Sequence, residues 1–206
     1  MAEIRNVDYG EMPRQASQMR TLGQELNGKL VDVYEAINNM RDNVWYGERY
    51  DSLVGEFNKI IPEINQLLTL VVGEIPFALE TIANNYAQAD RGTNVTSAQN
   101  TAPKKIQEMA LTKTGSKFKF ISDSVESVQS QVESDLTEAS EKMNEIEGVY
   151  GQIQWQSEAS EAFKTTFTRL KGEITSSFEN IKTQFTKLMT QTQQDVKAAE
   201  SSNTVG

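Results

Sequence analysis

Apolar side chains recur every three or four residues along most of this chain, in four long runs. The runs begin near Met12, Leu53, Ile121 and Ala159, and each continues through several heptads. This spacing is typical of amphipathic helices that each bury one stripe, and no stretch shows the period of two that a half-buried strand needs. The pattern therefore predicts an all-α protein made of long helices packed side by side.

The four runs form two pairs, and a tryptophan marks the break inside each pair. Trp45 and Trp155 are the only tryptophans, and they occupy equivalent places in the two pairs. We therefore predict a degenerate internal repeat of two helical hairpins, residues 1–90 and residues 118–206, the second ending in a short polar tail. Between them, residues 91–117 are small and polar and indicate a linker. Pro103 is expected to start a short helix within it that reaches Leu111.

The linker is much longer than the roughly 2–8 residues that join neighbouring helices in a simple bundle. It is long enough to run the length of a helix, so we expect the second hairpin to pack head-to-tail against the first as a four-helix bundle, a fused pseudo-dimer. The linker is also basic, whereas both hairpins are acidic, so we expect it to lie along their surface.

The charge and the missing residue types narrow the possible chemistry. The chain has no His and no Cys, and its net charge is -9. Thiolate and imidazole chemistry are therefore excluded, and the acidic balance argues against a nucleic-acid partner. The run Glu138, Glu141 and Glu145 is most simply a solvated helix face. We predict no enzymatic activity, no catalytic residue, no metal site and no cofactor.

Two further patterns concern membranes and targeting. The longest apolar stretch without a charge, Ile64–Gly73, is too short to cross a bilayer, which takes about 20 residues. The N-terminal residues do not show a basic region followed by an apolar one. We therefore expect a chain with no stable membrane span and no cleavable signal peptide.

The two tryptophan turns differ in their third residue. In Trp45-Tyr46-Gly47, the glycine supplies the positive φ that a turn between long helices needs, and the indole caps the hydrophobic seam. In Trp155-Gln156-Ser157, we expect Ser157 to cap the N-terminus of the next helix. The plain interpretation is that both tryptophans only fill their turns.

Tyr86 and Asp90 lie four residues apart at the end of the second helical run, and so share one helical face. An aspartate in the last turn opposes the helix dipole, which costs about 0.3–1 kcal/mol, so stability alone does not favour it. The equivalent residue four positions before Asp195 is Gln191 rather than a tyrosine. The plain interpretation is an ordinary helix end.

Together these motifs resemble the WXG family of early-secreted-antigen-like helical hairpins that type VII (ESX-type) systems secrete. The resemblance covers about residues 8–90 and 118–200, with Trp45 and Gly47 as the W-x-G turn and Tyr86 with Asp90 as the Y-x-x-x-D/E export signal. Ser157 departs from the family glycine. Two prolines depart from a regular family hairpin as well, and each is expected to kink or break its helix: Pro62 and Pro76.

The resemblance implies a bacterial protein, made in the cytoplasm and exported folded, that acts outside the cell or at its surface through protein–protein interaction. The implied partners are the type VII secretion ATPase or translocase and another secreted protein, for which the chain serves as an effector or a targeting partner. Family members work as dimers, so we expect an internal pseudo-dimer that is monomeric as a chain. The export machinery is expected to contact Tyr86, Asp90, Trp155 and Ser157, with Trp45 serving structure.

Two other functions remain open at this point. One is a pore-forming helical toxin with Ile60–Ala83 as its membrane hairpin, although this stretch contains three glutamates and two prolines. The other is a cytoplasmic helical adaptor or scaffold. The strongly apolar segment 67–72 likewise has two interpretations, a helix buried at the centre of the bundle or a docking face opened by a kink at Pro76.

Overall fold

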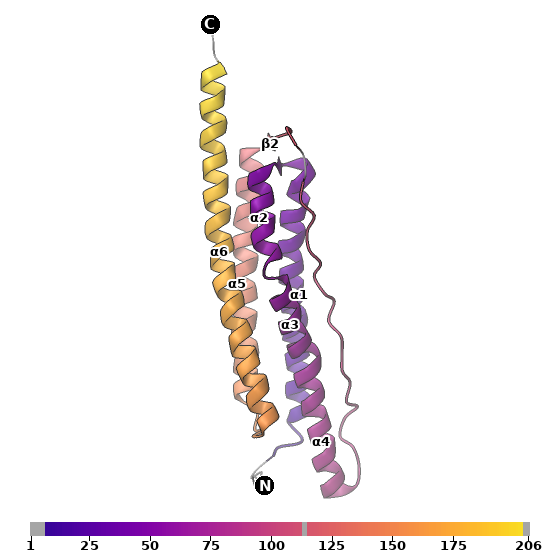
Figure 1. The fold of residues 1–206 in the computed structure, drawn as a ribbon. Coiled ribbons are helices and arrows are strands. Elements are labelled where there is room, and N and C mark those ends of the chain that lie inside the picture. Colours follow the sequence, from indigo (N-terminus) through magenta and orange to yellow (C-terminus); the bar gives the residue numbers. More distant parts are fainter. Residues whose placement is uncertain (1–6, 113–114, 204–206) are drawn as a thin grey trace. The chain divides into compact units, whose positions relative to one another are not determined.

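The computed structural model describes residues 7–112 and 115–203, and it confirms the expected all-α protein, with 77% of the chain helical. The helices are α1 (Met12–Asn43), α2 (Glu48–Asn58), α3 (Ile61–Leu68), α4 (Ile75–Arg91), α5 (Ser122–Gly151) and α6 (Glu158–Asn203). A π-helical turn, η1 (Thr69–Glu74), joins α3 to α4 (Figure 1). Two short strands, β1 (Trp45–Tyr46) and β2 (Lys119–Phe120), pair antiparallel.

The chain divides into two compact units that cut across the long helices. The first unit takes residues up to 29, residues 62–105 and residues 138–174, and the second takes residues 30–61, 106–137 and residues from 175 onward. Each unit therefore contains part of α1, part of the linker, part of α5 and part of α6. The division into hairpins 1–90 and 118–206 follows the chain instead and stays a prediction.

In the first unit, α1 packs very closely against η1. A Cβ atom added at Gly23 would lie 2.7 Å from a side-chain carbon of Val72, closer than real Cβ atoms come, so a larger residue here would push the two segments apart. The apolar segment Leu67–Val72 is part of the core: its leucines and valines are at most 3% exposed. The interpretation of this segment as a buried helix is correct, and the docking-face interpretation is wrong.

Both prolines coincide with interruptions of the second helical run, as expected. Pro62 is the second residue of α3, which follows a break after Asn58, and Pro76 is the second residue of α4, directly after η1. A proline has no N–H for the preceding turn and its ring crowds that turn, so the helix is interrupted at Pro62 and widened into a π-turn before Pro76.

The helical stretch Glu48–Arg91 also contains one window of 18 residues whose mean hydropathy, 1.4, would allow it to cross a membrane by length and composition. However, 61% of that window is buried inside the protein. The core helix of a soluble protein passes the same test, so this stretch is weak evidence for a membrane span.

In the second unit, Trp45 lies at the centre of an aromatic cluster. Its ring is fully buried and lies 5.5 Å from Phe120, 6.1 Å from Phe185 and 6.2 Å from Tyr50, measured between ring centroids. Gly47, at the N-terminus of α2, has φ of +133°, so the expected glycine turn is confirmed. The turn motif thus joins β1 to α2 around a buried indole.

The linker contains no helix in its described part, so the expected helix from Pro103 to Leu111 is wrong. Residues 94–112, which we call the strap, instead lie extended along the helices of each unit (Figure 1). Ile106 and Met109 anchor the strap in the second unit, where they are 5% and 3% exposed. Its expected position along the protein surface is confirmed.

Candidate functional site

The predicted export motif lies at the end of α4 in the first unit. Helix α4 ends at Arg91, and Gly92 follows in the left-handed conformation with φ of +69°, donating its N–H to the Gln88 carbonyl at 3.0 Å. Tyr86 is half-buried and Asp90 is exposed. The two side chains therefore stand on one face of a helix that stops one residue later, where a partner has access to both.

Asp90 has a hydrogen-bond partner that is remote in sequence. The hydroxyl of Tyr9 donates to a carboxylate oxygen of Asp90, and the Arg91 guanidinium lies 5.8 Å from the centroid of the Tyr9 ring. The hydrogen bond to Asp90 and partial desolvation raise the pKa of the Tyr9 phenol above its ordinary value. Asp90 is therefore held in one orientation, and Tyr9 and Arg91 offset its unfavourable position at the helix C-terminus.

The turn before α1 places Tyr9. A carboxylate oxygen of Asp8 accepts the N–H groups of Gly10 and Glu11, both at 3.1 Å, and this local turn starts the helix. Tyr9 is thereby directed away from α1 toward the end of α4. The sequence analysis missed Tyr9 because its contact with Asp90 joins residues 81 positions apart, and neither periodicity nor local spacing reports such a contact.

The residues of the second tryptophan turn mainly contact the first turns of the helix that follows, α6. The Ser157 hydroxyl accepts the N–H of Ser160 at 3.1 Å, so the expected N-cap of α6 is confirmed. Trp155 is only 8% exposed, with its ring 5.9 Å from that of Phe163, and its carbonyl accepts the Ser160 hydroxyl at 2.8 Å. Trp155 therefore presents little surface to a partner, and the Ser157 hydroxyl is already bound within its own turn.

The turn before α1 lies beside both predicted partner-binding motifs of the first unit, the end of α4 and the second tryptophan turn. The Gln15 side chain donates to the carbonyl of Gln152 at 3.3 Å, and Gln154 lines a hollow of about 590 Å³ together with residues 7–10. Tyr9 thus contacts Asp90 and borders the same hollow as Gln154, the neighbour of Trp155. Trp45 and Gly47 belong to the second unit, where they build their own turn.

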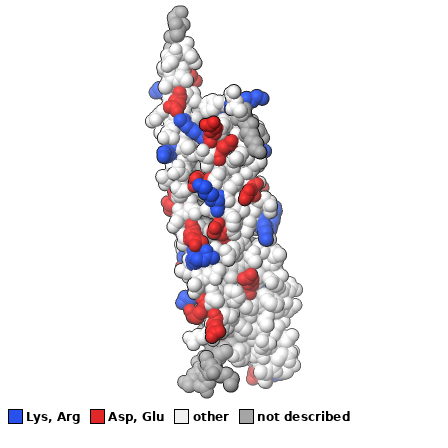
Figure 2. Space-filling model, viewed as in Figure 1, with Lys and Arg blue, Asp and Glu red and all other residues white. Residues whose placement is uncertain are grey.

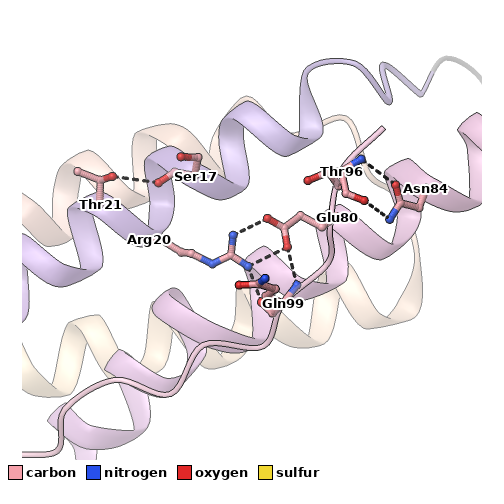
Figure 3. A network of polar contacts seen from close by, with 7 residues as sticks. All are labelled: Ser17, Arg20, Thr21, Glu80, Asn84, Thr96 and Gln99. Atoms are coloured by element: carbon pink, nitrogen blue, oxygen red, sulfur yellow. Dashed lines mark hydrogen bonds and ion pairs between the residues drawn. The ribbon is translucent and has the colours of Figure 1, made fainter. Parts of the chain in front are cut away.

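A second group of polar side chains in the first unit binds the backbone of the strap (Figure 3). The Arg20 guanidinium pairs with the Glu80 carboxylate, with one N–O distance of 2.8 Å, and Glu80 accepts the backbone N–H of Gln99 at 3.0 Å. Arg20 also donates to the Gln99 carbonyl. The pair and the strap therefore hold each other in place.

Burial and pairing have opposite effects on Glu80, which is 5% exposed. Burial raises its pKa, but the hydrogen bonds from Arg20 and from the Gln99 N–H, together with the Arg20 charge, outweigh burial. The net pKa of Glu80 lies below its ordinary value. Glu80 is therefore charged near neutral pH, and it stabilises the strap in that form.

The Asn84 side chain holds the start of the strap. Its oxygen accepts the N–H groups of Val95 and Thr96 at 3.0 and 3.1 Å, and its nitrogen donates to the Thr96 carbonyl at 3.0 Å. Further along, a Cβ atom at Gly73 would lie 2.8 Å from the Thr101 carbonyl oxygen, so the strap passes η1 at a distance that suits only glycine.

The second unit holds its part of the strap in the same way. The Asn58 amide donates to the Met109 carbonyl and accepts the Met109 N–H, both at 2.9 Å. Asp51 accepts the backbone N–H of Thr112 at 2.7 Å and its hydroxyl at 2.9 Å. Because most of these hydrogen bonds are made to backbone groups of the strap, they depend on its extended conformation more than on its side chains.

Metal binding and surface charge do not point to a further site among the described residues. In residues 7–112 and 115–203, no group of three or more acidic side chains is arranged to hold a metal ion. Acidic and basic side chains alternate over the face drawn in Figure 2, without a large area of one sign. The polar groups that bind distant parts of the chain lie at the end of α4 and along the strap.

Comparisons with known proteins give no relative: no family model, no curated protein and no solved structure matches this chain. The fold and the site therefore define only a class of protein: an all-α chain of long helices with a tryptophan turn and a polar helix end.

Proposed function

We propose that this chain is a type VII (ESX-type) secretion substrate, a tandem WXG-like protein whose two hairpins pack as a four-helix bundle and act through protein–protein interaction. The observation that carries the proposal is the end of α4. There an exposed Asp90 and a half-buried Tyr86, spaced as in the export signal of the family, stand one turn apart beside a helix stop.

Two other features support the proposal. The Trp45 turn has its glycine in a backbone conformation with φ of +133°, as a W-x-G turn requires. The Tyr9 hydroxyl holds Asp90 in one orientation, so a partner would meet a preorganised carboxylate. Stability alone does not account for Asp90, since a residue of opposite charge at position 90 would suit the helix end better.

In this proposal, the secretion ATPase or translocase binds Asp90 through its charge and Tyr86 through its amphipathic ring, with Tyr9 and Gln154 at the edge of the surface. Trp155 and Ser157 contribute by shaping the turn that carries Gln154. The exported protein then acts outside the cell, as an effector or as a targeting partner for another secreted protein.

The direct test is fractionation of a host that carries a type VII system. We expect the protein in the washed culture supernatant, without cytosolic marker proteins, and we expect it to disappear from the supernatant when the secretion ATPase is deleted. Retention in the cytoplasm of the intact strain would overturn the proposal and favour the helical adaptor or scaffold.

The pore-forming alternative requires the stretch Ile60–Ala83 to leave the core. Helix η1, in the middle of that stretch, is buried against Gly23 of α1, and Glu80 is paired with Arg20. Both contacts oppose such a release. Dye release from liposomes at neutral pH tests this alternative, and we expect none.

A further inference from the structure

Exposed apolar side chains are concentrated in one short stretch of the second unit. The large apolar side chains that stand out from the described surface are Leu111, Phe118 and Ile121, at 44%, 56% and 43% exposure, and Phe77 at 39%. The first three are close in sequence: Leu111 lies at the end of the strap, and Phe118 and Ile121 flank β2. Single exposed apolar residues are normal, but three of them in so short a stretch of sequence point to a contact surface.

This stretch is anchored from behind. The Phe120 ring packs on buried Trp45 at 5.5 Å, and the Ile121 N–H donates to the Val44 carbonyl at 3.0 Å. Gly115 turns the chain with φ of +59°. Phe118 and Ile121 lie on either side of this fixed strand, and each stays about half exposed. We call Leu111 and Gly115–Ile121 the tip.

The tip is also basic in a chain whose net charge is -9. It contains Lys117 and Lys119. Lys117 and Phe118 line a hollow of about 310 Å³ with Glu48 and with Arg49, which is itself paired with Asp195 of α6. Lysines that flank exposed apolar side chains suit a partner whose outer layer is anionic and whose interior is apolar: the lysines match the charge, and the apolar side chains match the interior. The acidic remainder of the chain is repelled by the same surface, which would orient the protein with its tip toward it.

We propose that the tip is a peripheral docking site for a bilayer that contains anionic lipids. Phe118, Ile121 and Leu111 enter the interface between headgroups and acyl chains, and the lysines bind lipid phosphates. A protein partner fits less well, because three exposed side chains fall short of the roughly 800 Å² per partner that a stable protein interface buries. Each lysine near an anionic bilayer contributes about a fivefold gain in binding.

The experiment is flotation of the full-length protein with vesicles of phosphatidylglycerol and phosphatidylcholine, and with phosphatidylcholine alone. We expect binding to the anionic vesicles at low salt. We expect that binding to weaken strongly at about 1 M salt, where the Debye length is about 3 Å. The double variant Lys117→Glu/Lys119→Glu should raise the lipid concentration for half-maximal binding at least tenfold, and Phe118→Ser should raise it severalfold.

Two variants elsewhere on the chain serve as matched controls. Phe77→Ser removes an exposed aromatic residue of α4 outside the tip, and Lys197→Glu reverses an exposed charge on α6. Both should bind vesicles like the wild type, and thermal melting should show all variants folded. The proposal is overturned if the wild-type protein does not float with anionic vesicles, or if Phe77→Ser weakens binding as much as Phe118→Ser. Secretion plays no part in this test, so it is independent of the proposed function.

Discussion

Glu80 is a charged residue in the core of the first unit, so its contribution to stability depends on pH. Its pKa in the folded protein lies below the ordinary value of 4.5. The stabilisation is therefore present above that ordinary value and is lost as the pH falls through the lowered pKa of the folded state. We expect Glu80→Gln to reduce the free energy of unfolding by about 3 kcal/mol at neutral pH, because Arg20, whose side chain is only 17% exposed, loses its countercharge.

Urea denaturation of Glu80→Gln and of the wild type measures this loss, and the difference between them should shrink as the pH falls below the ordinary value of 4.5. The matched control is Glu11→Gln, which breaks an exposed pair with Arg14, whose side chain is 63% exposed. That control should change stability by less than about 1 kcal/mol. Equal losses in both variants would contradict the assigned role of Glu80.

Trp45 contributes its volume rather than a hydrogen bond. It is fully buried, and its indole N–H has no partner among the residues that the structure describes. We expect Trp45→Ala to cost about 3–5 kcal/mol through the cavity it leaves, and Trp45→Phe to cost only about 1 kcal/mol. Thermal and urea unfolding measure both variants. A loss as large for phenylalanine as for alanine would show that the indole nitrogen is needed.

At the scale of elements, the strap is held by side chains of helices. The Asn58 amide bonds both backbone groups of Met109, so Asn58→Ala leaves both without that partner, and we expect a loss of about 1–3 kcal/mol. Hydrogen exchange should show faster exchange of the Met109 amide. Asn58→Asp keeps the acceptor for the Met109 N–H but loses the donor, so its effect should be smaller. Unchanged exchange in Asn58→Ala would contradict the clamping role.

The helices and the strap show which elements the sequence predicts well. The three-four spacing identified the helical runs, because positions such as Leu26 and Phe178 that follow it are fully buried. The strap has no such period: Asn58 and Asn84 bind its backbone, and contacts of this kind leave no repeating pattern. The helix expected from Pro103 is absent because a single short helix is marginal alone, and the strap backbone already has side-chain partners.

The sequence likewise predicts part of the candidate site and misses the rest. The spacing of Tyr86 and Asp90 places them on one helical face, and the position of Ser157 before an acidic first turn predicts its cap. The contact of Tyr9 with Asp90, and the burial of Trp155, depend on how distant segments pack. Local sequence patterns do not contain that information.

At the scale of the whole molecule, the first hairpin depends on the rest of the chain. A fragment of residues 1–90 lacks Phe120 and Phe185, which pack on Trp45, and lacks the strap bound by Glu80 and Asn58. We expect this fragment to be weakly folded or to self-associate. Light scattering after gel filtration, with a thermal melt, measures both properties. A monomeric fragment as stable as the full chain would contradict the expected bundle.

The central claim is that the end of α4 is an export signal, and secretion of point variants tests it most directly. The variants are Asp90→Ala and Tyr86→Ala. The matched control is Asp195→Ala, which removes an exposed aspartate of α6 that pairs with Arg49 and has no tyrosine four residues earlier. Melting temperatures of Asp90→Ala and Asp195→Ala should stay near that of the wild type, since both aspartates make only exposed contacts. Tyr86→Ala removes a half-buried ring and should lower the melting temperature somewhat without unfolding the protein.

Immunoblots of culture supernatant and of cells then give the answer for each variant. The account predicts that Asp90→Ala and Tyr86→Ala accumulate in cells and are missing from the supernatant, while Asp195→Ala is secreted like the wild type. Normal secretion of both Asp90→Ala and Tyr86→Ala, at wild-type cellular levels, would contradict the account and leave the pair as an ordinary helix end.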